Sequence, residues 1–275
     1  MQNILLPSKM SFSEGTKESE AILTIEPLHM GYGTTIGNAL RRVLLSSLEG
    51  AAVTAVKVKG AQHEFSTIEG VKEDVLDIIL NLKQLRLKVH SDQPIVLNLD
   101  VSGSAREVRA EDISPNADVE IINSDLLIGT LTTDTAKLQL EITVGRGRGY
   151  VPTEERDEDV RDIGVMAVDA LFSPVVNVSM NVENTRVGEI TNYDKLVMYI
   201  TTDGTITPQD AVVDATRIIM NHFNWIDGQL THGSLTEDVK PDKEEETEPE
   251  VQDEVEAEVS ELVAEPAEEA VESEE

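Results

Sequence analysis

Two apolar helical patterns, one near each end of the body of the chain, most constrain how it can fold. Residues 34–48 and residues 207–228 both repeat apolar side chains at the i, i+3, i+4, i+7 spacing of a helix. The second pattern is apolar on several sides, which is typical of a helix with two surfaces to bury. The segments between them alternate as strands do. We therefore predict that the two ends fold together, with the middle of the chain inserted between them.

The first helix follows a strand and a glycine turn. A β-branched run ends at Ile25, Gly31-Tyr32-Gly33 turns the chain, and Thr34 or Thr35 is the expected N-cap of a helix that ends before Gly50. Its apolar stripe consists of Ile36, Ala39, Leu40, Val43, Leu44 and Ser47. Asn38, Arg41, Arg42 and Leu45 lie partly off this stripe. We interpret a cationic pair beside an exposed leucine as a docking surface.

The second helix has clear start and stop signals. Thr207 is the expected N-cap, Pro208 suits the first helical position, and Asp210 complements the positive end of the helix. The helix is predicted to run to about Asp227 and to stop at Gly228. Its main stripe is Val212, Ala215, Ile219, Phe223, Ile226 and Leu230, broadened by Val213, Ile218, Met220 and Trp225.

The middle of the chain is predicted to be rich in strands. Apolar residues alternate over 85–89, 95–101 and 138–144, and after Pro174 they alternate again over 176–182 and 196–200. Polar residues between them predict antiparallel sheet with one packed face and one solvated face. Residues 72–81 predict one helix, with Val75, Ile78, Ile79 and Leu82 on its buried face. The fold class is therefore α+β.

Charge is concentrated at the end of the chain. The net charge is −31, and residues 236–275 carry 19 acidic residues and two lysines, a net of −17. That segment has no aromatic residue and three prolines, so it cannot bury enough apolar surface to offset chain entropy. We predict that 236–275 is a disordered acidic tail. The chain has no cysteine, which excludes disulfides and thiolate metal sites.

No catalytic residue, cofactor site or metal site is expected. The five histidines show no close ligand spacing, and His63-Glu64 is interpreted as a polar pair at a turn. Gly31, Gly33 and Gly37 form GxGxxxG, one residue longer than the dinucleotide fingerprint, and no P-loop lysine follows. A nucleotide-dependent enzyme built on these glycines stays open as an alternative, as does an acidic-tailed chaperone.

Nucleic acid and membrane are not expected partners. Residues 146–150 (Arg-Gly-Arg-Gly-Tyr) resemble an RGG segment, but they stand alone in an acidic chain with only nine aromatic residues. Direct sequence-specific DNA binding is therefore not expected. No apolar run approaches the roughly 18 residues of a membrane span, and no secretory signal is visible. These features predict a soluble cytoplasmic protein, or a protein of the plastid stroma if it is organelle-encoded.

Several ordered segments resemble a known family. They are residues 26–50 (Glu-Pro-Leu-His-Met-Gly-Tyr-Gly-Thr-Thr-Ile-Gly-Asn-Ala-Leu-Arg-Arg through Gly50), 63–75 (His-Glu-Phe-Ser-Thr-Ile-Glu-Gly-Val-Lys-Glu-Asp-Val), 81–83 (Asn-Leu-Lys), 146–152, 168–169 and 173–175. Together they resemble the amino-terminal assembly domain of the bacterial-type RNA polymerase alpha subunit, over most of residues 1 to about 232. The family usually continues into a helical carboxy-terminal domain that contacts promoter DNA. In this sequence an acidic low-complexity segment stands in the place of that domain. Contact with promoter DNA is therefore not expected.

The resemblance implies an architecture and a homodimer. Residues 1–49 and 175–235 would form a discontinuous dimerisation domain, 50–174 an inserted strand-rich domain, and 236–275 the tail. The implied dimer contacts are Ile36, Leu40, Val43, Leu44, Ile219, Phe223 and Ile226. From the residues alone, core within one chain is the favoured interpretation of the same stripes, because a stripe does not say which chain it packs on.

The resemblance also implies a non-catalytic function. One protomer of the dimer would recruit the beta subunit and the other the beta-prime subunit, giving the core of DNA-directed RNA polymerase. Beta docking falls on Arg42 and Leu45, and beta-prime docking falls on Lys83 and Val168. From the residues alone, Lys83 is a solvated lysine and Val168 is core. The tail is expected to act as a solubilising segment, or as a DNA mimic that limits non-specific binding.

Overall fold

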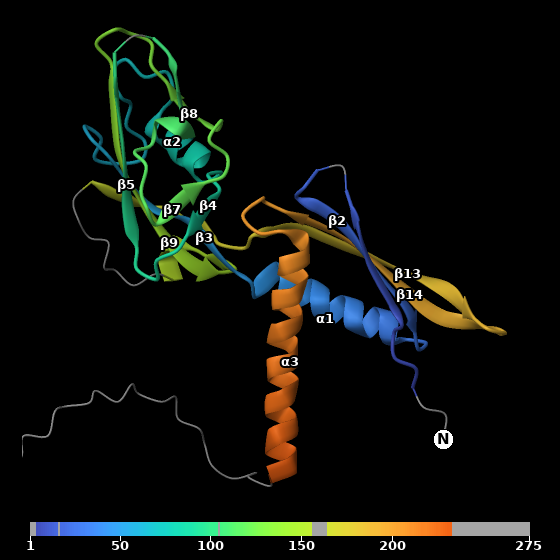
Figure 1. Cartoon of the computed structure of the whole chain (residues 1–275). Helices are drawn as coiled ribbons and strands as arrows, with labels where there is room; N and C mark the ends of the chain where they lie inside the picture. The colour runs from blue at the N-terminus through green and yellow to red at the C-terminus, as the bar shows by residue number, and fades with distance from the viewer. Residues whose placement is uncertain (1–3, 16, 104, 156–163, 233–275) are drawn as a thin grey trace, which may run out of the picture.

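The computed structural model describes residues 4–15, 17–103, 105–155 and 164–232 (Figure 1). The predicted acidic tail, residues 236–275, lies outside these ranges. The described residues form two strand-rich units whose sheets share no strand. The α+β fold class with a strand-rich insert is confirmed.

The first unit is built on a four-stranded antiparallel sheet made from both ends of the body. Its strands are β1 (Lys9–Glu14), β2 (Glu20–Leu28), β13 (Val175–Val187) and β14 (Ile190–Thr202), in the order β1-β2-β14-β13. Leu23 of β2 is opposite Met198 of β14, and both side chains are fully buried. Segments more than 150 residues apart in sequence therefore form one sheet, so the two ends of the body fold together as the two helical patterns predict.

Two helices cover this sheet. Helix α1 (Tyr32–Ser46) packs on β13 and β14, and helix α3 (Pro208–His232) packs against α1 through its first half. Thr207 caps α3 as predicted, because its Oγ1 accepts a hydrogen bond of 3.1 Å from the backbone N–H of Asp210. The core of the unit contains Leu23, Leu28, Leu40, Leu44, Leu48, Val175, Val178, Leu196, Met198, Ile200, Ala211, Val212 and Ala215.

The second unit is built from the middle of the chain. Its main sheet has the order β11-β3-β9-β5, formed by β11 (Val165–Ala167), β3 (Glu49–Val58), β9 (Lys137–Arg148) and β5 (Ile95–Ser102). Helix α2 (Val75–Leu82) buries the four predicted residues, Val75, Ile78, Ile79 and Leu82. Three short pairs complete the unit: β4 (Leu87–Val89) with β7 (Val119–Ile121), β6 (Glu107–Arg109) with β8 (Leu127–Thr130), and β10 (Tyr150–Val151) with β12 (Ala170–Leu171). Short 3-10 turns span Ala110–Asp112 and Thr153–Glu155.

Three local predictions are corrected. Helix α3 continues through Gly228 to His232, since glycine is tolerated in a helix interior at a modest cost. Helix α1 begins at Tyr32, so neither Thr34 nor Thr35 is its N-cap. Strand β13 has a bulge between Val175 and Asn177, which shifts the alternation and leaves Val176 exposed while Val178 is buried.

The chain passes between the two units where β3 begins, and glycines allow a close approach there. A Cβ added to Gly50 would overlap the backbone carbonyl oxygen of Phe172. A Cβ added to Gly147 of the neighbouring strand would lie 2.7 Å from the Phe172 ring. This contact explains Gly147 of the Arg146–Tyr150 region without any nucleic acid.

Replacing Gly50 by alanine is expected to lower the free energy of unfolding by about 3 kcal/mol, because a backbone carbonyl cannot move aside as a flexible side chain can. Gly145→Ala on β9 is the matched control, since its Cβ would meet only Thr54 Cγ2 at an ordinary 3.6 Å. We expect that control to change stability by no more than about 1 kcal/mol. Urea unfolding of both variants checks this, and equal losses would contradict it.

Candidate functional site

The glycine turn before α1 is occupied by a carboxylate of the same chain. Gly31 has a φ of 88°, a conformation that favours glycine. The Oδ2 atom of Asp194, on β14, accepts hydrogen bonds from the backbone N–H groups of Gly31 at 2.9 Å and Gly33 at 3.0 Å. Asp194 is only 7% exposed. A buried negative charge thus fills the position that a bound phosphate would take at a helix N-terminus.

The other two glycines of the motif let α1 lie close to the sheet. A Cβ on Gly33 would lie 2.9 Å from Val182 Cγ1, and a Cβ on Gly37 would lie 2.8 Å from Met180 Sδ. The GxGxxxG spacing therefore serves helix packing and capping. The interpretation of these glycines as a nucleotide-binding loop is wrong. Sequence reasoning missed Asp194 because it lies 161 residues from Gly33, with no local signal to connect them.

Asp194→Ala is expected to reduce the free energy of unfolding by about 1–3 kcal/mol, because two amides at the start of α1 lose their acceptor. Asp194→Asn keeps one acceptor oxygen, so its loss should be smaller. Urea unfolding of the two variants tests this order. Equal stability of the alanine variant and the unmodified chain would contradict the capping role.

The face of α1 that carries the predicted beta-docking pair is partly open. Arg42 is exposed, and Leu45 is half-buried with part of its side chain against the core. Among the described residues no carboxylate forms an ion pair with the Arg42 guanidinium, so its five donors face solvent. The assignment of Arg42 and Leu45 to docking stays a prediction.

The predicted dimer residues of α1 are placed differently. Leu40 is 6% exposed and Leu44 is 0% exposed, and both lie in the core beneath the helix. Their stripe packs on the sheet of their own chain, so the prediction that Leu40 and Leu44 contact a partner is corrected. Ile36 and Val43 are half-buried at the edge of the same core and keep some accessible surface.

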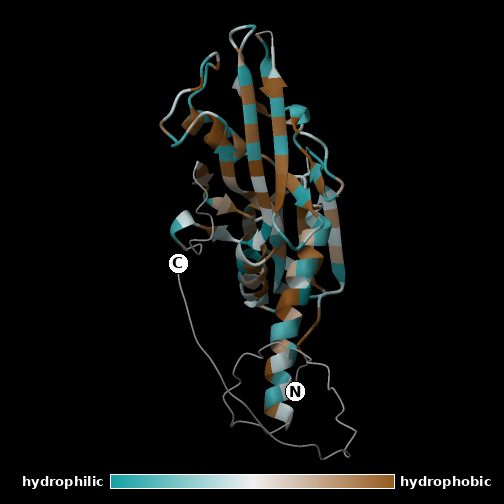
Figure 2. Ribbon diagram, turned by 90° about the vertical axis from the view of Figure 1, so that its left-hand side faces the viewer, coloured by the Kyte–Doolittle hydropathy of each residue, from teal (hydrophilic) through white to brown (hydrophobic). Residues whose placement is uncertain are grey.

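The second half of α3 carries the large apolar surface of this unit. Figures 1 and 2 show this half of the helix extending away from the other elements, with apolar residues (brown in Figure 2) recurring to its far end. Phe223 is 65% exposed, and Ile226 is 46% exposed. The other exposed apolar residues here are Met220, Trp225 and Leu230, while Ile219 is half-buried nearer the body. A contiguous apolar surface of this kind marks a protein–protein contact.

The two predicted beta-prime residues come together on the second unit. Lys83 at the end of α2 is exposed, and its Nζ lies 3.4 Å from Oδ2 of Asp169, the neighbour of Val168. Val168 itself is 3% exposed and belongs to the core. The prediction that Val168 contacts a partner directly is corrected, because a buried side chain has no surface to offer. Its burial instead fixes where Asp169 lies.

The pKa of Asp169 is lowered from its ordinary value. The backbone N–H of Thr153 donates a hydrogen bond of 3.1 Å to its Oδ1, and this bond, followed by Lys83, lowers the pKa of Asp169. A lowered pKa contributes stability that is present above the ordinary aspartate value of about 3.9 and is lost as the pH falls through the folded value. The Lys83–Asp169 pair therefore persists at neutral pH.

Other candidate chemistry is weak in the described residues. His63 Nδ1 lies 3.2 Å from Ser66 Oγ, which is a polar pair at a turn. In the described ranges, histidine and carboxylate side chains nowhere gather in a group of three that could hold a metal ion. None of the described helices combines the length and apolar character needed to cross a bilayer.

The open face of α3 and the exposed cation on α1 define a protein whose candidate sites are contacts with other proteins. Residues 56–173 match the family model described as the RNA polymerase Rpb3/RpoA insert domain. The chain is 50% identical over 222 residues to the DNA-directed RNA polymerase subunit alpha of Oceanobacillus iheyensis, covering 81% of this chain and 70% of that protein. It is 49% identical over 223 residues to the same subunit of Alkaliphilus oremlandii, covering 81% and 69%. The chain belongs to the bacterial RNA polymerase alpha-subunit family.

Proposed function

We propose that this chain is the non-catalytic subunit on which RNA polymerase assembles. The observation that carries the proposal is the exposed apolar half of α3, in a chain half identical to subunits named DNA-directed RNA polymerase subunit alpha. A helix with one buried half and one open apolar half requires a second protein to cover it. A second copy of the chain is the partner that supplies the same surface in return.

The proposed homodimer buries α3 against its copy. Phe223 and Ile226 would lie at the centre of the contact, with Ile36, Val43 and Ile219 at the side nearer the body. An aromatic and aliphatic surface of this kind is typical of obligate interfaces, which bury roughly 2,000 Å² or more. The domain boundaries 1–49 with 175–235, and 50–174, are part of this proposal.

The proposed contacts with the large subunits lie away from that face. On one protomer, Arg42 offers a bidentate guanidinium and Leu45 an apolar anchor to the beta subunit. On the other protomer, the surface at Lys83 and Asp169 meets the beta-prime subunit, with Val168 holding Asp169 in place from beneath. An asymmetric pair of large subunits on a symmetric dimer requires that each protomer uses only one of its two surfaces.

Co-expression with the beta and beta-prime subunits of the same source tests this function. Purification through a tag on this chain should recover a complex that extends RNA on a primed template. The same purification without the large subunits is the control and should yield a dimer with no extension. Recovery of a free dimer from the full co-expression would contradict the assembly role.

A further inference from the structure

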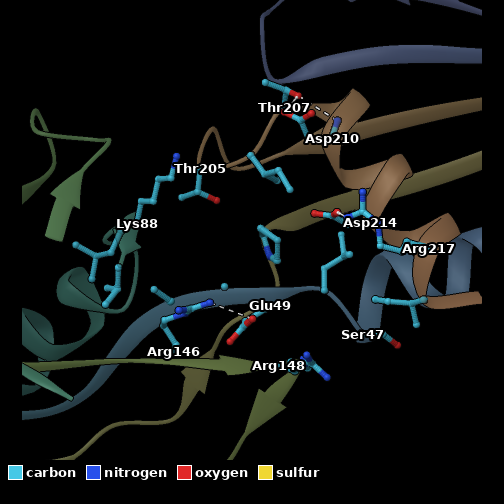
Figure 3. Close-up of a pocket in the computed structure, with 18 of the residues that line it drawn as sticks. Ser47, Glu49, Lys88, Arg146, Arg148, Thr205, Thr207, Asp210, Asp214 and Arg217 are labelled. Atoms are coloured by element: carbon cyan, nitrogen blue, oxygen red, sulfur yellow. Dashed lines mark hydrogen bonds and ion pairs between the residues drawn. The ribbon is translucent and has the colours of Figure 1, made fainter. Parts of the chain in front are cut away.

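A cleft of about 560 Å³ lies at the junction of the two units and belongs to neither of the proposed docking surfaces. One wall comes from the start of β3, the end of β9 and β4 (Figure 3). The other wall comes from the loop before α3 and the first half of α3, including Asp214 and Arg217. Leu48, Leu87, Val89, Pro174, Ile206 and Ile218 give it an apolar lining between charged groups.

The cleft has a net charge of +1, and two of its cations form no ion pair with another described residue. Four basic residues line it, Lys88, Arg146, Arg148 and Arg217, against three carboxylates, Glu49, Asp210 and Asp214. Arg146 pairs with Glu49 at 3.1 Å, and Arg217 pairs with Asp214 at 2.8 Å. Asp210 accepts a hydrogen bond of 2.7 Å from the Thr207 hydroxyl.

Lys88 and Arg148 are exposed, and among the described residues neither forms an ion pair. Both belong to the strand wall, and Figure 3 draws them well apart along it, with the Arg146–Glu49 pair between them. Two separated cations along a wall that also carries apolar residues suit an extended acidic segment with apolar residues. They do not suit one compact anion, which would need both cations at one point.

The chain carries a segment of this description. Between Glu250 and Glu265, Val251, Val255, Val259 and Leu262 recur every three or four residues, with glutamates on either side. The whole of residues 236–275 has a net charge of −17. We infer that this acidic segment binds in the cleft of its own chain, with its carboxylates on Lys88 and Arg148 and its valines on the apolar lining.

The connection along the chain makes this contact accessible. Residues 214–221 of α3 line the cleft, and the helix ends at His232, about 17 Å further along at 1.5 Å per residue. The 18 residues between His232 and Val251 would have a root-mean-square span of roughly 23 Å if they behave as a flexible linker. A tether of this length gives an effective concentration on the order of millimolar, so even a weak contact is populated.

Disulfide trapping in the full-length chain tests the inference, and the absence of native cysteines makes the result specific. Ser260→Cys places a thiol in the acidic segment, and Ser47→Cys places one in the cleft wall. The control pair is Ser260→Cys with Ser102→Cys, because Ser102 is exposed on β5 and lines no part of the cleft. Under mild oxidation we expect the Ser47 pair to form an intrachain disulfide about ten-fold faster than the control pair. High salt should slow the first pair and leave the second unchanged, because screening weakens exposed charge pairs.

Charge reversal supplies the decisive comparison. Lys88→Glu with Arg148→Glu should slow trapping of the Ser47 pair about ten-fold, and Lys88→Gln with Arg148→Gln should slow it less. Lys59→Glu with Lys72→Glu is the matched control, because both lysines are exposed and line no part of this cleft. The inference would be overturned if the glutamate substitutions at Lys88 and Arg148 left the trapping rate unchanged. It would also be overturned if the control substitutions at Lys59 and Lys72 slowed trapping equally. Protection of the Ser47 thiol only when the large subunits are bound would overturn it as well, since their acidic segments would then be the occupant.

Discussion

Arg42→Ala is expected to weaken capture of the beta subunit on the order of 30-fold or more, while the fold and the dimer are unchanged. Arginines at the centre of an interface contribute about 2 kcal/mol or more, and every 1.4 kcal/mol is ten-fold in affinity. The guanidinium is exposed and forms no ion pair within the described residues, so its removal leaves nothing unpaired in this chain. Its effect on stability should stay within about 0.5 kcal/mol.

Titration of the beta subunit against the tagged dimer measures this loss, and the melting temperature of the free dimer confirms an intact fold. Arg41→Ala is the matched control, because Arg41 is the exposed neighbour on the same helix but points about 100° away. If Arg42→Ala retained full beta binding, the docking assignment would be wrong. An equal loss in Arg41→Ala would show that general positive charge, and not a fitted contact, attracts the beta subunit.

Periodicity predicted the elements well where one face is packed and the other is solvated. The alternation over 138–144 becomes the central strand β9, and all four predicted residues of α2 are buried. Both patterns depend on local spacing alone, which the sequence contains in full. The two broad helical patterns predicted only that the two ends of the body fold together. They did not predict that β2 pairs with β14.

The sequence could not show which side of a stripe meets the chain's own core. Leu40 and Leu44 satisfy the same spacing as Ile226, yet they are buried on the sheet and Ile226 is open. The apolar pattern predicts that these side chains are buried. Only the three-dimensional packing shows which of them the chain buries in its own core and which stay exposed for a partner. Val168 shows the same limit. The family resemblance assigns it to docking because of its place in a motif, but the fold places its side chain in the core.

Long-range polar contacts were also beyond local patterns. The sequence predicts a threonine cap at the start of α1, but the acceptor is Asp194, more than 160 residues along the chain. With Asp194 as the acceptor, the helix begins at Tyr32, before either threonine. A carboxylate that pairs with amides 161 residues away leaves no spacing signal in a single sequence.

Phe223→Asp is expected to convert the dimer into monomers at micromolar concentration, raising the dimer dissociation constant on the order of 100-fold or more. Phe223 is 65% exposed on the chain alone, so a charge there leaves the monomer core intact. In a dimer it would place a carboxylate inside an apolar contact, where an unpaired charge costs several kcal/mol. The two-fold relation doubles this penalty, because each copy brings the same aspartate.

Light scattering after size exclusion measures the change in mass, and circular dichroism checks that helix content is kept. Asn224→Asp is the matched control: it adds the same charge at the next residue of α3, about 100° around the helix from Phe223 and outside the main apolar stripe. A dimeric Phe223→Asp variant would place the interface elsewhere on the molecule. Dissociation by both variants would attribute the effect to repulsion between two acidic chains, because net charge alone then separates them.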